Sequence, residues 1–234
     1  GLTDLHPQSL AGLEQLVVFD ISQNNFREGI SLEIPSQLIV LDISNSSLHT
    51  CPSLHSSKTT QRILQLDLSA NMITSISNNC TANITYVSLN VDGNALQHID
   101  PPRCYKRPCE AVSLHLTNNK LNEIHLNCSL QNTYKIVNLT GNNISSIHGT
   151  LGSPAKGACV ISELDLSENN LGPFVHQNEE FIKSAFDYFN HYGKLTHHFA
   201  SHINLQFCRI RAIAEKTFVY INFNNLDLSN NDIH

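Results

Sequence analysis

An eight-residue phrase recurs along this chain, and no other feature of the sequence constrains its fold as strongly. The phrase LDLSENNL, at residues 164–171, alternates apolar and polar residues and then ends on Asn and Leu. Close variants occupy residues 19–26, 41–48, 66–73 and 226–233. Such alternation predicts a short strand with one buried face, so the chain must form the same short strand several times.

Alignment on this phrase gives nine copies of the pattern L-x-x-L-x-L-x-x-N-x-L, where L stands for an aliphatic residue or Phe. The residues at the Asn position, here called rungs, are Asn24, Ser46, Asn71, Asn119, Asn142, Asn169, Cys208 and Asn231. The fourth copy reads Ile84, Val87 and Leu89, with Asn94 and Leu96 two residues late. A pattern of this kind, repeating every 20 to 29 residues or so, is the signature of the leucine-rich repeat.

The repeat predicts an α/β solenoid shaped like a horseshoe. Its short strands form a parallel sheet on the concave face, and the convex side is irregular or helical. The rung amide can donate to and accept from backbone groups where the chain turns off each strand, which predicts a ladder of Asn side chains. Ser46 is the weak rung, and Cys208 is expected to be a buried, inert thiol.

Residues 1–234 are expected to form one array, and because neither end shows a capping segment, the chain is expected to be a fragment of a longer protein. Residues 172–199 lengthen one repeat, since 39 residues separate Asn169 from Cys208. This stretch carries a helical apolar stripe and predicts a helical insertion. The stripe consists of Phe181, Ile182, Ala185, Phe186 and Phe189.

Seven cysteines and six Asn-x-Ser/Thr sequons favour a secreted or cell-surface chain carrying N-linked glycans. The predicted glycosylation sites are Asn45, Asn79, Asn83, Asn127, Asn138 and Asn143. Asn138 should point outward from the concave face, where a glycan would mask its middle. No apolar run is long enough to cross a membrane, so any attachment would use a segment outside this chain. The 14 Lys and Arg form no stripe, which argues against nucleic acid as the main partner.

Cysteines in comparable loops of adjacent repeats should come within disulfide reach. The predicted pairs are Cys51–Cys80, Cys128–Cys159 and, as a small local loop, Cys104–Cys109. Six cysteines allow fifteen connectivities, so the other pairings stay open.

The outward positions of the strands are where a partner could bind. The candidate contacts on the concave face are Val40, Gln65, Tyr86, His115, Ile136 and Glu163. Apolar and aromatic groups on a polar face suit contact anchors. A row of Asp residues, including Asp20, Asp42 and Asp67, could form an acidic stripe, but a structural role is favoured.

No sequence motif points to catalysis, a cofactor or a metal. The chain has no Gly-rich phosphate loop, no G-x-S-x-G and no H-E-x-x-H. The cluster of His191, His197, His198 and His202 could suggest a metal site or a pH switch, but exposed loop histidines are the favoured interpretation. The chain is therefore expected not to be an enzyme.

The repeats, sequons and paired cysteines resemble extracellular leucine-rich repeat proteins. The stretch from LDLSENNLGPF to LDLSNNDI is similar to the membrane-proximal part of Toll-type receptor ectodomains, and the cysteine pairs also resemble secreted invertebrate leucine-rich immune proteins. The resemblance implies a recognition module that binds a protein ligand, such as a cystine-knot cytokine, or a microbial ligand, and often works as a homodimer or heterodimer. The alternative is a structural or adhesive protein that makes cell–cell or matrix contacts.

Overall fold

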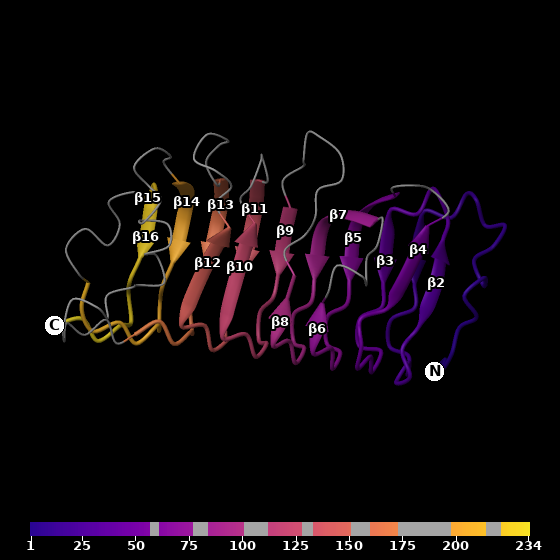
Figure 1. Ribbon diagram of the computed structural model, residues 1–234, viewed down its shortest axis with the longest axis horizontal. Helices are drawn as coiled ribbons and strands as arrows, with labels where there is room; N and C mark the ends of the chain where they lie inside the picture. The colour runs from indigo at the N-terminus through magenta and orange to yellow at the C-terminus, as the bar shows by residue number, and fades with distance from the viewer. Residues whose placement is uncertain are drawn as a thin grey trace. The chain divides into compact units, whose positions relative to one another are not determined.

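The computed structural model describes most of the chain, in eight segments. They are residues 1–56, 61–76, 84–100, 112–127, 133–150, 160–172, 198–213 and 221–234. The chain divides into two compact units. Unit 1 comprises residues 1–107 and 112–119, and unit 2 comprises residues 108–111 and 120–234. Each unit is a parallel β-solenoid in which one main strand per turn, or coil, stacks on the next (Figure 1).

The five main strands of unit 1 are parallel and pair in chain order within the unit. They are β1 (Val18–Asp20), β3 (Val40–Asp42), β5 (Gln61–Asp67), β7 (Ile84–Asn90) and β9 (Val112–His115). Four shorter strands form two separate two-stranded parallel sheets. These are β2 (Ser31–Ile34) with β4 (Ser53–Ser56), and β6 (Ser75–Ile76) with β8 (His98–Ile99).

Unit 2 repeats this arrangement. Its main strands are β11 (Thr133–Asn138), β13 (Val160–Asp165) and β14 (His198–Asn204), and β14 also pairs with β15 (Ile221–Asn222) and β16 (Asn225–Asp227). The strands β10 (Glu123–Asn127) and β12 (Ser146–Thr150) form the second sheet. The long interval between Asn169 and Cys208 leaves the register intact, because Glu163 still lies opposite His202.

The apolar residues of the repeat pattern form the core of each unit. In the second copy Leu38, Leu41, Ile43 and Leu48 are all buried, and the third copy buries its equivalents. A single coil cannot cover its own apolar face, so the stack supplies the neighbour that each coil needs. The predicted repeat solenoid with a parallel sheet is therefore confirmed.

The prediction of a helical convex side is wrong for the described residues, because they contain no helix. An apolar residue five positions after the rung is buried instead, as Ile76, Ile99 and Ile124 show, and these residues lie in β6, β8 and β10. Only three residues separate the rung from each of these strands, which is too short for a helix of several turns. The predicted helical insertion belongs to residues 172–199, of which residues 173–197, including the stripe from Phe181 to Phe189, lie outside the described residues.

The predicted alignment of the fourth copy is also wrong. Leu89 pairs with Leu66, so the copy reads Tyr86, Leu89, Val91, Asn94 and Leu96 with no delay before its rung. Tyr86 lies opposite Ile63 and is only 9% exposed. It belongs to the core and is not available as a contact on the outward face.

Candidate binding face and the ladder that supports it

A ladder of side-chain amides joins the coils beneath the outward face. The Oδ1 atom of Asn71 accepts the backbone N–H groups of Ser46 (2.9 Å) and Leu48 (3.0 Å) in the preceding coil. Its Nδ2 atom donates to the carbonyl oxygens of Ile43 (2.9 Å) and Leu68 (3.0 Å). One buried side chain therefore satisfies four buried backbone groups and fastens two coils together.

The same bonds recur at other rungs. An Oδ1 atom accepts a backbone N–H from the preceding coil and the Nδ2 atom donates to a carbonyl of that coil at Asn94, Asn119, Asn169 and Asn231. Asn142 accepts from Leu121, and Asn24 accepts from Leu2. Asn94 joins the rungs once the fourth copy is placed correctly.

The residue before each rung adopts the left-handed backbone conformation in all nine coils. Its φ lies between 48° and 68° at Gln23, Asn45, Ala70, Gly93, Asn118, Gly141, Glu168, Phe207 and Asn230. Only two of the nine are glycine, although a positive φ costs other residues roughly 1–2 kcal/mol. The turn off the main strand therefore imposes this conformation whatever the side chain.

The two rungs that are not Asn share a backbone feature. Ser46 and Cys208 are each followed by a second left-handed residue, Ser47 (φ 58°) and Arg209 (φ 59°). Their own carbonyl oxygens accept a backbone N–H from the preceding coil, from Phe26 at 2.8 Å and from Gly172 at 3.1 Å. Phe26 lies two residues after its rung, where an Asn amide oxygen would accept, so the Ser46 carbonyl replaces that oxygen, whereas Gly172 lies three residues after its rung and is a different donor.

The Cys208 thiol is a buried donor. Its Sγ atom donates to the carbonyl oxygen of Leu166 at 3.1 Å. Burial raises the pKa of Cys208 to about 11, so the thiol stays protonated at neutral pH. A protonated, buried thiol is a poor nucleophile, and Cys208 acts as a structural rung.

The Asp and Asn residues that end the main strands have a structural task. In each case Oδ1 accepts the backbone N–H of the residue two positions later. The residues are Asp20, Asp42, Asp67, Asn90, Asn138, Asp165, Asn204 and Asp227. The backbone N–H and the hydroxyl of Ser22 hold the pKa of Asp20 below its ordinary value, and Ser229 does the same for Asp227.

An exposed apolar row crosses the outward face of unit 1, and sequence reasoning missed it. Val17, Ile39 and Leu64 are 43%, 37% and 39% exposed, and they occupy the same position in successive coils. Val87 and Val112 continue the row in a half-buried state. We call these five residues the apolar row. The sequence does indicate this row, because the residue after the first L of the pattern is aliphatic in all five copies.

Unit 2 has no such row. The equivalent positions hold Lys135, Ser162, Ser201 and Asn224. The two units therefore present different chemistry from the same strand position, although the ladder beneath them is the same. A structural requirement of the repeat would make both rows alike, so the apolar row is not explained by the fold.

The structure places five predicted contacts on outward strand positions and removes Tyr86. Val40 is half-buried and lies opposite the exposed Gln65 in unit 1. In unit 2 the half-buried Ile136 lies opposite the exposed Glu163. The fifth residue, His115, is half-buried and ends the Asp and Asn row of unit 1.

The structure describes part of the predicted glycan and disulfide chemistry. Asn45 and Asn143 are exposed, and Asn138 is half-buried with its Oδ1 atom bonded to Thr140. Three sequons and five cysteines lie outside the described side chains. They are Asn79, Asn83 and Asn127, and Cys80, Cys104, Cys109, Cys128 and Cys159. Cys51 is half-buried, and its predicted partner, Cys80, lies outside the described residues. All three disulfide pairings therefore stay predictions.

The described part of the chain shows neither a metal cluster nor a membrane-spanning helix. No three His, Cys, Asp or Glu side chains there lie together as metal ligands, and no helix there has the length and hydropathy to cross a membrane. His191 and His197 lie outside the described residues, while His202 is exposed beside Glu163. No family model, curated protein or solved structure matches the chain.

Proposed function

We propose that this chain is an extracellular recognition module that catalyses no reaction and binds a protein ligand through the apolar row. The observation that carries the proposal is the exposure of Val17, Ile39 and Leu64 in register. Five parallel strands spaced about 4.8 Å apart give a row about 20 Å long. Single exposed aliphatic residues are ordinary, but a contiguous row on a polar face is typical of a contact surface.

The neighbouring row indicates what the ligand should carry. Asp20, Asp42 and Asp67 lie in register on the same face, three residues along each strand from the apolar row, or about 10 Å away. The lowered pKa of Asp20 keeps its carboxylate charged in mild acid. A ligand that places apolar side chains beside Lys or Arg would complement both rows.

The extracellular setting and the receptor role rest on the sequence. Asn45 and Asn143 are exposed where a glycan can be attached, which suits the secretory pathway. The resemblance to Toll-type ectodomains favours a protein ligand, such as a cystine-knot cytokine, that stabilises a dimer. A microbial ligand and an adhesive role are the competing proposals.

Surface plasmon resonance with the immobilised chain tests the proposal. The probes are a panel of purified cystine-knot cytokines, lipopolysaccharide and the chain itself. We expect a cytokine to bind, and the double substitution Ile39→Ser with Leu64→Ser to weaken binding at least 30-fold, because the loss of even one buried contact anchor costs about 2 kcal/mol. The matched control changes the same position in unit 2, with Ser162→Ala and Ser201→Ala, and should leave the affinity unchanged.

Three results would count against the proposal. Binding that survives the double substitution would show that the apolar row is not the contact. Binding of lipopolysaccharide alone would favour the microbial ligand, and self-association lost with the same substitutions would favour adhesion.

A further inference from the structure

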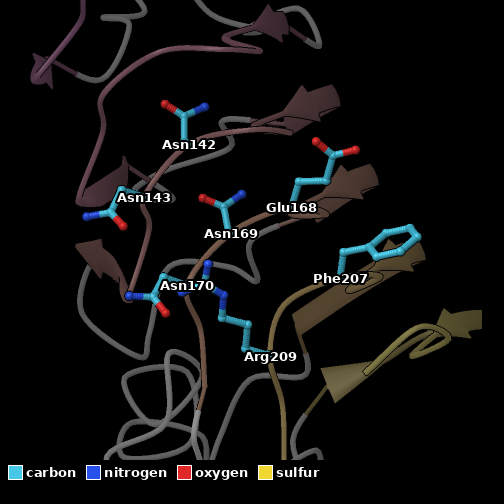
Figure 2. Close-up of a pocket in the computed structure, with 7 residues that line it drawn as sticks. All are labelled: Asn142, Asn143, Glu168, Asn169, Asn170, Phe207 and Arg209. Carbon is cyan, nitrogen blue, oxygen red and sulfur yellow. The ribbon is translucent and has the colours of Figure 1, made fainter. Parts of the chain in front are cut away.

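A pocket in unit 2 has features that the ladder and the apolar row do not explain. It has a volume of about 310 Å³, close to the lower end of the range for small-molecule sites. It lies at the edge where the chain turns off the main strands (Figure 2). Its lining residues are Asn142, Asn143, Glu168, Asn169, Asn170, Phe207 and Arg209.

Phe207 is unfavourable here on two grounds. Its φ is 55°, in the region that costs a bulky residue free energy, and Gly or Asn fills the equivalent position in five other coils. Its side chain is also 52% exposed, so burial of the ring does not offset that cost. The positive φ belongs to the turn of every coil, so the feature that sets Phe207 apart is an exposed aromatic ring beside a pocket.

The polar side chains around Phe207 fall into two groups. The amides of Asn142 and Asn169 are used by the ladder. Within the described part of the chain, the side chains of Glu168, Asn170 and Arg209 make no hydrogen bond or ion pair. Figure 2 shows Glu168 and Phe207 projecting to one side of the pocket, while Asn170 and Arg209 are drawn on the other.

We propose that this pocket binds a pyranose sugar. The ring of Phe207 stacks on the apolar C–H face of the sugar, and Glu168, Asn170 and Arg209 bond its hydroxyl groups. One carboxylate and one guanidinium give the lining no net charge, so a simple anion would meet Glu168 and a simple cation would meet Arg209. A neutral ligand with an apolar face and many hydroxyl groups matches all four side chains.

The sugar has two possible sources with the same chemistry. Asn143 is a predicted glycosylation site, is exposed and lines this pocket. An N-glycan on Asn143 begins with two N-acetylglucosamine units. The Nδ2 atom that would carry it donates to Oδ1 of Asn122 in the preceding coil at 2.9 Å, so this side chain must turn for the glycan to enter the pocket. The other source is a glycan on a different molecule.

Titration with free disaccharides tests the site. The protein is the full chain with Ser145→Ala, which removes the sequon and leaves Asn143 in place, and the probes are chitobiose, cellobiose, lactose and mannobiose. Binding is followed by NMR through the ring resonances of Phe207. We expect at least one probe to bind. Phe207→Tyr should retain binding, and Phe207→Gly should weaken it at least tenfold. Because the Phe207→Gly chain has no ring at this position, its binding is followed by saturation transfer to the sugar.

Stability separates a binding role of Phe207 from a structural one. Glycine adopts a positive φ freely, so Phe207→Gly should keep or raise the midpoint of thermal unfolding while binding is lost. Asn230→Gly changes the same position of the next coil and should leave sugar binding unchanged.

The glycosylated chain identifies the source. If chitobiose binds the Ser145→Ala chain and not the glycosylated chain, the protein's own glycan fills the pocket. If a probe binds both, the site takes an external sugar. The proposal is overturned if no probe binds the Ser145→Ala chain, or if Phe207→Gly binds as well as the parent.

Discussion

Replacing Asn71 by Ala should lower the free energy of unfolding by about 4 kcal/mol or more. The substitution leaves the backbone N–H groups of Ser46 and Leu48 without an acceptor, and it removes the donor to Ile43. Ser46, Leu48 and Ile43 are all fully buried, so water cannot replace the lost bonds. Each buried group left unpaired costs about 1–3 kcal/mol. Urea unfolding followed by circular dichroism measures the change.

Two further variants separate the hydrogen bonds from the volume of the side chain. Asn71→Asp keeps the acceptor, loses both donors and buries a charge, so it should also be strongly destabilising. Asn231→Ala removes the same bonds from a half-buried rung. The space that its side chain leaves opens to water, which can then bond the freed backbone groups, so the variant should cost about 1 kcal/mol. An equal cost at Asn71 and Asn231 would contradict the role assigned to the buried ladder.

Gly172→Ala should destabilise unit 2 by about 3 kcal/mol or more. A Cβ atom on Gly172 would lie 2.0 Å from the carbonyl oxygen of Arg209 and 2.5 Å from its carbonyl carbon. Both are backbone atoms of the next coil, which cannot move away without breaking the bond from Gly172 N–H to the Cys208 carbonyl. Overpacking against backbone costs about 1–3 kcal/mol and more where relaxation is blocked. Thermal unfolding measures the effect.

Gly12→Ala is the matched control for this prediction. Gly12 has a positive φ of 82°, but a Cβ atom there would meet nothing within 4 Å. Its substitution should therefore cost only the backbone strain, about 1 kcal/mol. If the two alanine variants were equally stable, the close approach of the seventh and eighth coils at Gly172 would be wrong.

The architecture could be predicted because the repeat pattern indicates both the single strand and the stacking of strands. Alternation around residues such as Leu41 and Ile43 predicts the strand, and repetition of Asn71, Asn119 and Asn169 predicts the stack. These residues contact their own equivalents in neighbouring coils. A one-dimensional repeat in the sequence therefore maps directly onto the packing.

The fourth copy could not be placed by alternation alone. Val87, Leu89 and Val91 are all odd-numbered, so a shift of two residues keeps the same alternation along the strand. Only the distance to the rung decides, and Asn94 must come three residues after the third core position of the copy, which is therefore Val91. Counting back from Asn94 places Val91, Leu89 and Tyr86 at the core positions.

The pocket could not be predicted, because its components are set by backbone conformation. Glu168, Phe207 and Arg209 carry no sequence sign of a positive φ, unlike Gly93 or Gly141. The side of the pocket on which each side chain lies follows from that turn (Figure 2). The short second strands were missed for a similar reason, since one buried Ile per coil gives too little pattern to recognise.

Hydrogen exchange of the Asn side-chain amides, measured by NMR, tests most directly whether buried amides hold successive coils together. The Nδ2 protons of Asn71, Asn94, Asn119 and Asn169 should be strongly protected, because each of these amides donates to the carbonyl of a residue in the preceding coil. The exposed Asn45 should exchange at the rate of an unprotected amide. Equal exchange rates at the rungs and at Asn45 would contradict the ladder.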